Sequence, residues 1–192
     1  MRVCRYSFML AFLDFEASSL GKRSYPIEVA WVFEDGRSEA HLIRPAPDWL
    51  DWDPAAEAVH HINRLQLIAE GTPHEAVAQR MVDALAGHDL LASAPSWDGK
   101  WMSALLRAAG LPRHTLRLRD SDDALRESAI AILRPVTPAG RLDEVVSQVL
   151  ASSELRGPGQ QPVHRALADA EDEHARWLQV CAKAKRMATI LR

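Results

Sequence analysis

The feature that most constrains this chain is an apolar run that ends in two carboxylates. Residues 8–13 read Phe, Met, Leu, Ala, Phe and Leu, and Asp14, Phe15 and Glu16 follow them. Because side chains alternate along a strand, Asp14 and Glu16 are expected on one face and Phe15 on the other. Two acids at the end of a buried strand repel each other, so the pattern favours a divalent cation with oxygen ligands. The alternative is a strand that simply ends in solvent, where Asp and Glu are common.

The size and composition of the chain predict one soluble domain covering residues 1–192. The 192 residues are 47% hydrophobic and 26% charged, and no segment approaches the roughly 20 apolar residues of a membrane span. Arg2 and Arg5 precede the apolar run, as in a signal peptide, but no clean cleavage pattern follows, so a buried strand and a cytoplasmic location are expected. Cys4 and Cys181 are expected to be free thiols.

The net charge of −3 argues mildly against a protein that grips long duplexes, because such binding relies on many Lys and Arg contacts to phosphates. Nucleic acid stays possible as a partner, since metal ions neutralise the acids gathered around them.

The periodicity of apolar residues predicts an α/β fold with a mixed five-stranded sheet and helices on both of its faces. Strand-like segments come first, and strand-like and helix-like segments alternate afterwards. The expected strands are residues 7–15, 27–33, 39–43, 89–96 and 116–118. The expected helices are residues 72–87, 98–109, 122–133 and 142–150, and a long helix after His164. Residues 45–54 and the Gly- and Pro-rich residues 157–162 are expected to be loops.

Asp98 supplies a third acid, because it follows an expected strand where a helix begins. Ligand sites in open α/β sheets tend to lie at such junctions, although an Asp there can equally be a helix cap. His164 and Asp169 form a further pair. Five residues apart, they do not share a helix face, so we expect His164 on the loop and Asp169 in the first turns of the helix. A histidine near a helix start is also commonly just a polar surface residue.

Taken together, the order Asp-x-Glu, Asp, His-x4-Asp resembles the DEDDh family of 3′-to-5′ exonucleases, which includes RNase T, oligoribonuclease and the proofreading subunit of bacterial replicative polymerases. Residues 25–30 (Tyr-Pro-Ile-Glu-Val-Ala) look like the family's second strand, residues 59–62 (Val-His-His-Ile) like its HxI segment, and residues 166–170 (Ala-Leu-Ala-Asp-Ala) like its third motif. The likeness runs from Phe8 to about Trp177. Each piece is weak alone, but their order and spacing make the combination specific. The resemblance implies an RNase H-like fold.

The resemblance also implies a reaction. Two ions of Mg²⁺ or Mn²⁺ would be held by four carboxylates, those of Asp14, Glu16, Asp98 and Asp169. His164 would act as general base on a water that attacks the terminal phosphodiester, releasing a nucleoside 5′-monophosphate. The residues that the resemblance places near the terminal nucleotide are Ala17, Ser18, Leu20 and, close to its sugar, His60. The partner would be the 3′ end of single-stranded DNA or RNA, or a short oligonucleotide.

The chain departs from the family pattern at two positions near Asp98. Ala94 stands where the family often has Asn, which puts one hydrogen bond near the substrate or metal site in doubt. Trp97 replaces the usual Phe, a conservative change. Neither change removes a metal ligand.

Other residues invite functional readings that the sequence does not favour. His60 and His61 are adjacent and lack partners at zinc-site spacing. Most of the six tryptophans are expected in the core or anchoring loops rather than stacked on bases. The basic residues Lys183, Lys185 and Arg186 suit a solvated helix end.

Two competing hypotheses stay open from the sequence alone. The first is a catalytically weak or inactive nucleic-acid-binding module of the same fold, against which the complete set of four carboxylates and one histidine argues. The second is a protein of another class whose acids match by accident, in which case Asp14 and Asp98 would lie far apart. The sequence decides neither RNA against DNA nor substrate length, the metal used in the cell or the biological pathway, and a homodimer is possible by analogy with the family.

Overall fold

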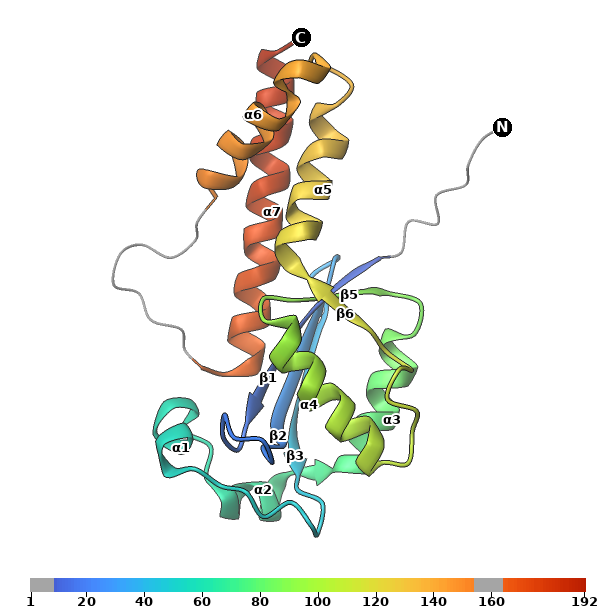
Figure 1. The fold of residues 1–192 in the computed structure, drawn as a ribbon, viewed down its shortest axis with the longest axis vertical. Helices are drawn as coiled ribbons and strands as arrows, with labels where there is room; N and C mark the ends of the chain where they lie inside the picture. The colour runs from blue at the N-terminus through green and yellow to red at the C-terminus, as the bar shows by residue number, and fades with distance from the viewer. Residues whose placement is uncertain (1–8, 154–163) are drawn as a thin grey trace.

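The structure is a computed structural model of the chain, and it describes residues 9–153 and 164–192. These residues form six strands and seven helices (Figure 1). The predictions for Cys4, for the first residues of the expected first strand and for the loop at residues 157–162 lie outside the described residues.

The sheet has six strands in the order β4-β3-β2-β1-β5-β6. The strands are β1 (Leu10–Ala17), β2 (Pro26–Phe33), β3 (Ser38–Arg44), β4 (Thr72–Pro73), β5 (Asp89–Ala92) and β6 (Leu118–Asp120). Strands β1, β2 and β3 pair antiparallel and form a meander, whereas β5 pairs parallel with β1 and β6 parallel with β5. The sheet is therefore mixed, as predicted.

The prediction of five strands was wrong by one, because Thr72 and Pro73 form a short strand and not the start of a helix. Thr72 pairs in parallel with Ile43, and Pro73 with Arg44. Gly71 makes this possible: a Cβ at that position would come within 2.7 Å of the Arg44 backbone nitrogen. Without a side chain, the chain approaches the edge of the sheet closely enough to pair with it.

The helices are α1 (Pro54–His60), α2 (Arg64–Glu70), α3 (His74–Leu85), α4 (Pro95–Ala108), α5 (Ser121–Leu133), α6 (Ala139–Ala151) and α7 (Ala166–Ile190). Helices α1 and α2 were not predicted from the sequence; each has seven residues, and they begin after the side-chain caps Asp53 and Asn63. None of the described helices is both long and apolar enough to cross a lipid bilayer.

The two faces of the sheet carry different layers. Alternate residues of β1, including Leu13 and Phe15, share a buried cluster with Met81 of α3 and Leu105 of α4. The opposite face of β1 packs against α7: the ring of Phe12 lies 5.5 Å from that of His174. Asp14 and Glu16 have the same parity as Phe12, so the strand turns them toward α7.

A second core lies beyond the sheet, where α5, α6 and α7 pack together as a helical arm (Figure 1). Its buried residues are Leu125, Ala129, Leu133, Val145, Val146, Val149, Val180, Ala184 and Ala188. Helix α7 belongs to both parts, since its first half covers the sheet and its second half completes this arm. The sheet therefore fixes the beginning of α7, and the arm fixes its end.

Candidate active site

The predicted carboxylates on β1 lie at the end of the strand, half-buried, on the face that α7 covers. Glu16 is followed by an irregularity in the pairing: Glu16 lies opposite Glu28, but Ala17 lies opposite Pro26. Strand β2 thus contributes one extra residue at this point, as in a β-bulge, a feature common next to active sites. The expectation that Asp14 and Glu16 share a face is confirmed by the register.

Helix α7 brings two further predicted residues to the same place. Ala166 and Ala170 are fully buried, and their small side chains let the first turns of α7 lie close against the sheet. One donor atom from each of Glu16, His164 and Asp169 consequently lies within 4.8 Å of the others. Asp169 is in the first turn of α7, and His164 precedes the helix with a left-handed backbone (φ 51°), as the sequence analysis expected of a loop residue.

Asp98 reaches the site from the opposite side, in the first turn of α4. The prediction that it stands exactly between strand and helix was wrong: β5 ends at Ala92 and α4 begins at Pro95, a residue favoured in a first helical turn. The cap position belongs to Ala94, so Asp98 is not the N-cap of α4. Its side chain is only 2% exposed, and the buried Oδ2 atom has no hydrogen-bond partner among the described residues.

The carboxyl groups of this cluster influence one another strongly. Burial, and then the charges of Asp98 and Glu16, raise the pKa of Asp14 well above its usual value. Burial together with the charges of Asp169 and Glu28 raises the pKa of Glu16 to about 8, although Arg165 opposes part of that rise. After burial, the charge of Asp98 is the largest influence on the pKa of Asp14. This supports a shared cluster of acids over an accidental match with the two residues far apart.

The pKa of Asp98 is raised as well, and here burial is the only cause of the rise. Burial raises its pKa to about 7, while backbone N–H groups of Phe15 and Ala94 offset part of the rise. The remaining Oδ2 atom is buried and has no partner in the described part of the chain. Leaving a buried acceptor unsatisfied costs about 1–3 kcal/mol, so this atom is suited to an additional ligand.

These observations fit a site for hard divalent cations. The donors are mainly carboxylate oxygens from Asp14, Glu16, Asp98 and Asp169, the ligand type that Mg²⁺ and Mn²⁺ prefer. A cation between them would remove the repulsion that raises their pKa values and would satisfy a buried oxygen such as Oδ2 of Asp98. Among the described residues, Asp14 and Asp98 do not join the 4.8 Å group of Glu16, His164 and Asp169, so the donors surround an extended space rather than one point.

A fifth acid, Glu28, was treated in the sequence analysis only as part of a strand. It is 3% exposed and lies opposite Glu16 in the sheet. Its carboxylate accepts hydrogen bonds from Arg165, at 2.6 and 3.0 Å, and from the backbone N–H of Ala166 at 3.0 Å. The sequence did contain a signal for this pair. Glu28 lies on the strand expected next to that of Glu16, and Arg165 directly follows the predicted base His164.

The residues that the family resemblance places near the terminal nucleotide differ in exposure: Ala17 and Ser18 are buried, and Leu20 is exposed. Ala17 is buried in the core, and Ser18 is buried with its hydroxyl accepting a hydrogen bond from the N–H of Tyr25 at 3.1 Å. Leu20 is 72% exposed and lines a pocket of about 490 Å³ with Trp97, itself 39% exposed. The remaining lining residues are Gly21, Lys22, Ser96 and Lys100.

His60 ends α1 and is buried, at 2% exposure. Its Nδ1 accepts a hydrogen bond from the N–H of Ile62 at 3.1 Å, which assigns the ring proton to Nε2. That Nε2 has no partner among the described residues. The charges of Glu28 and Arg165 both influence its pKa, which burial lowers, so His60 lies near the site. Its contact with a sugar stays a prediction.

Comparison with known proteins identifies the fold. No protein-family model and no curated protein matches the chain. The structure of E. coli exonuclease I in complex with a dA16 oligonucleotide is similar, with 19% identity, a TM-score of 0.65, and coverage of 95% of this chain and 42% of that one. Exonuclease I from Methylocaldum szegediense is also similar, with 19% identity, a TM-score of 0.62, and coverage of 89% and 40%.

A zinc-bound form of the E. coli exonuclease I complex with single-stranded DNA matches at 20% identity, with a TM-score of 0.60 and coverage of 95% and 41%. The chain therefore has the RNase H-like fold of these nucleases and spans about two fifths of their length. At this level of identity the likeness concerns the fold, and the chemistry rests on the residues of this chain.

Proposed function

We propose that this protein is a divalent-metal-dependent 3′-to-5′ exonuclease that acts on single-stranded DNA or RNA and releases nucleoside 5′-monophosphates. The observation that carries the proposal is the gathering of Asp14, Glu16, Asp98 and Asp169 beside His164 at one end of the sheet. The fold adds support, because exonuclease I shares it and has been solved with a dA16 oligonucleotide.

The proposed reaction needs an activated water and a stabilised leaving oxygen. Two ions of Mg²⁺ or Mn²⁺ held by the four carboxylates would supply both. His164 would accept the proton of the attacking water, a role supported by one of its ring nitrogens lying within 4.8 Å of carboxylate oxygens of Glu16 and Asp169. The half-buried ring sits at the edge of the cluster, on a backbone that turns just before α7.

The pocket between Leu20 and Trp97 is the proposed binding site for the base of the 3′-terminal nucleotide. Both side chains are apolar and exposed, and the pocket-lining residues Ser96 and Trp97 share the beginning of α4 with Asp98. Lys100 holds its walls together: its ammonium donates to the carbonyl of Gly21 at 2.7 Å and lies 5.0 Å from the centre of the Trp97 ring. A flat base stacked between an aliphatic and an aromatic side chain is bound with little regard to sequence.

A basic segment next to the site supports a nucleic-acid substrate in spite of the net negative charge. Residues 99–119 contain five Lys and Arg residues and no Asp or Glu. Arg113 and Arg117 are exposed, form no ion pair in the described part of the chain, and line a groove of about 330 Å³ with Pro95 and Gly99 of α4. The groove shares helix α4 with Asp98, and we propose it as a path for the phosphates of the upstream strand.

The experiment is digestion of 5′-labelled single-stranded oligonucleotides, as DNA and as RNA, with Mg²⁺ or Mn²⁺. A ladder that shortens from the 3′ end, and that disappears with EDTA or in the Asp14→Ala variant, is expected. Strands that stay intact while still binding to the protein would reject the proposal and favour the inactive binding module.

A further inference from the structure

We propose that Glu28 and Arg165 are positioning residues that hold His164 and Asp169 in place, an inference that rests on the proposed function. Neither side chain is assigned to the reaction itself. Their role is to attach the start of α7 to strand β2. The proposed base His164 precedes this start, and Asp169 follows it in the first turn.

Both carboxylate oxygens of Glu28 accept hydrogen bonds from the beginning of α7. Oε1 of Glu28 accepts from Nη2 of Arg165 at 2.6 Å, and Oε2 accepts from Nε of Arg165 at 3.0 Å and from the N–H of Ala166 at 3.0 Å. Bidentate pairs of this kind fix the geometry of both partners. The Glu28 side chain is 4% exposed, so water competes little with these bonds.

The pair also replaces a helix cap. Arg165 occupies the N-cap position of α7, and its own side chain makes no capping hydrogen bond. The first backbone N–H groups of a helix need acceptors and favour negative charge nearby. Glu28 provides both from the neighbouring strand through its bond to the N–H of Ala166. The beginning of α7 is thus fixed by a side chain 138 residues earlier in the chain.

His164 and Asp169 are each linked directly to Arg165. His164 directly precedes Arg165 and has a left-handed backbone, a conformation that non-glycine residues adopt only when their surroundings enforce it. Asp169 follows by the first bond of the helix, because its N–H donates to the carbonyl of Arg165 at 3.1 Å. A shift of Arg165 would therefore move the base and the carboxylate together.

Glu28 differs from Asp98, and this difference separates the roles of the two acids. Both of its oxygens are engaged within the protein, whereas Oδ2 of Asp98 has no partner among the described residues. A carboxylate already shared between a guanidinium and a backbone N–H is a poor candidate for a metal ligand. Its charge is balanced by Arg165 and is not left for a cation.

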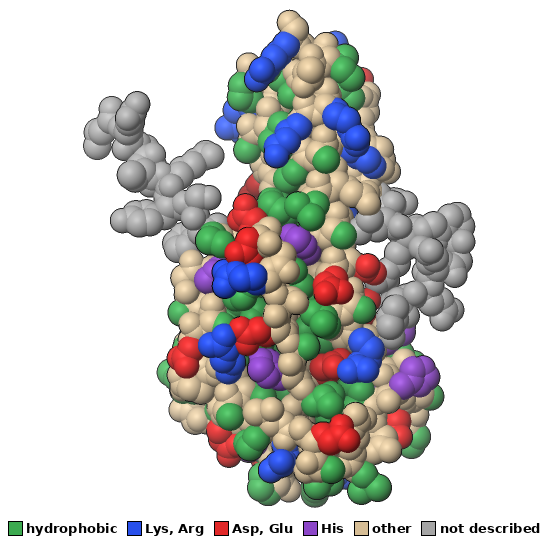
Figure 2. Space-filling view, turned by 180° about the vertical axis from the view of Figure 1, so that it is seen from behind, with side chains coloured by type: hydrophobic (Ala, Val, Ile, Leu, Met, Phe, Trp, Pro, Cys, Tyr) green, Lys and Arg blue, Asp and Glu red, His purple; other side chains and the backbone are tan. Residues whose placement is uncertain are grey.

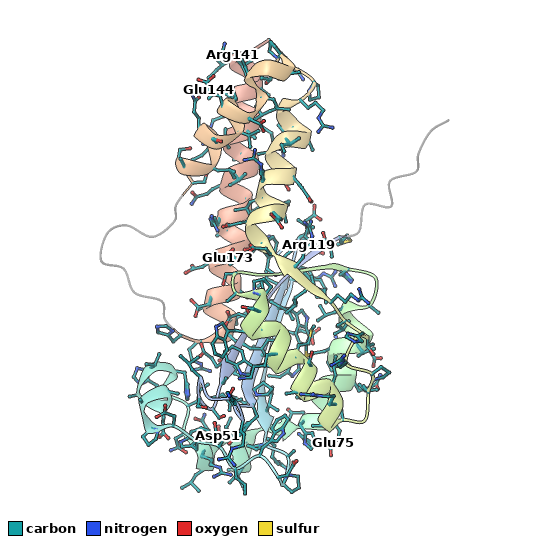
Figure 3. All side chains as sticks on the ribbon, viewed as in Figure 1. Asp51, Glu75, Arg119, Arg141, Glu144 and Glu173 are labelled. Carbon is teal, nitrogen blue, oxygen red and sulfur yellow. The ribbon has the colours of Figure 1, made fainter. Side chains whose placement is uncertain are left out.

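The test compares Glu28→Gln, Arg165→Gln and the double variant with a matched control. The control is Asp89→Asn, because Asp89 forms a comparable bidentate pair with Arg119, with bonds of 2.7, 2.9 and 3.0 Å. Arg119, labelled in Figure 3, belongs to β6 at the edge of the sheet. The measurements are kcat and KM on a single-stranded oligonucleotide, the midpoint of thermal unfolding, and amide hydrogen exchange of residues 164–170.

We expect kcat to fall roughly 10- to 100-fold in either single variant, with KM changed less than about threefold, because a displacement of about 1 Å at a reacting group has an effect of that size. The double variant should lose little more than either single variant, since the two side chains act as one unit. Exchange at the first turn of α7 should become faster. Asp89→Asn should lower the unfolding midpoint while leaving kcat unchanged.

Three results would overturn the inference: losses that add in the double variant, a kcat in Glu28→Gln equal to that of Asp89→Asn, or unchanged exchange at residues 164–170. The exchange measurement does not depend on turnover. If the wild-type protein degrades no oligonucleotide, the proposed function fails, and exchange alone then decides whether Glu28 anchors the start of α7.

Discussion

Glu16 and Glu28 lie directly opposite each other on strands β1 and β2. Like charges at such positions destabilise a sheet, and the protein treats the two acids differently. Glu28 is bonded to Arg165, whereas burial and the neighbouring acids raise the pKa of Glu16 to about 8. One member of the pair is therefore neutralised within the protein, and the other retains an electrostatic cost that a cation can remove.

The first prediction concerns the metal-free protein, whose stability should fall as pH rises from about 4 to 8. The pKa of Glu16 is raised from 4.5 to about 8 and that of Asp98 from 3.8 to about 7. Between these values the folded state holds protons that the unfolded state has lost, so folding is favoured at low pH and this advantage disappears as pH passes the raised values. Thermal unfolding in EDTA at several pH values measures the slope, and a midpoint that rises over this range would contradict the prediction.

The second prediction is that Asp98→Asn separates stability from activity. The amide removes a buried charge without changing the size of the side chain, so the metal-free variant should unfold at a higher temperature than the wild type at pH 8, and its stability should depend less on pH. Hydrolysis should fall by at least about 1000-fold because a ligand is lost. Unfolding scans with and without Mn²⁺, together with rate measurements, check both parts. A variant that keeps wild-type activity would remove Asp98 from the site.

The sequence predicted well those parts of the fold that depend on the spacing of nearby residues. The apolar run before Asp14 favoured a buried strand, and alternation then predicted Asp14 and Glu16 on one face. The spacing of His164 and Asp169 likewise predicted one residue before the helix and one inside it. These inferences need no knowledge of distant neighbours.

The features that the sequence missed depend on contacts between distant segments. Strand β4 exists because Gly71 lets the chain approach Arg44, an edge pairing that no periodicity reveals. The bond from Glu28 to Arg165 joins residues 137 positions apart. The helical arm is a further case: its apolar stripes were visible, but their mutual packing into a core separate from the sheet was not.

The basic residues of the arm match the sequence prediction in part: Lys185 and Arg186 are exposed, but α7 continues to Ile190 and its last turn contains no basic residue. Residues 174–192 contain five Lys and Arg residues and no acid. In Figure 2, Lys and Arg side chains predominate at the arm's upper end, and Asp, Glu and His side chains lie mainly over the half that contains the sheet. Lys185 and Arg186 are exposed, so they provide a control for charge effects elsewhere.

The third prediction tests the pocket beside Asp98. Leu20→Ala and Trp97→Ala should each raise KM for a single-stranded substrate by roughly 5- to 50-fold, because stacking of one base contributes about 1–3 kcal/mol. Since Leu20 is 72% exposed, its loss should change the unfolding midpoint little, whereas the loss of Trp97, which is 39% exposed and packs against Trp101, should lower the midpoint more. Steady-state kinetics and thermal unfolding distinguish the two effects, and the exposed Leu65, at 75%, serves as the control for loss of an apolar surface residue. Unchanged KM in both variants would place the terminal base elsewhere.

The fourth prediction concerns the groove at Arg113 and Arg117, which should bind phosphates of the upstream strand. The double variant Arg113→Glu and Arg117→Glu should weaken binding of a long single strand roughly tenfold. It should also reduce the slope of log affinity against log salt by about 1.4, since each lost phosphate contact on a single strand contributes about 0.7. Fluorescence anisotropy with oligonucleotides of graded length at several salt concentrations measures both quantities.

In that experiment the length of the oligonucleotide shows whether the groove binds the upstream strand. Strands of fewer than about four nucleotides should bind both proteins equally, because they end before they leave the site, whereas longer strands should not. Lys185→Glu with Arg186→Glu makes the same change of net charge on the arm and should leave binding at every length close to that of the wild type. If the arm variant weakens binding as much as the groove variant, overall charge and not this groove governs the encounter. If neither does, the strand leaves the metal site along another surface.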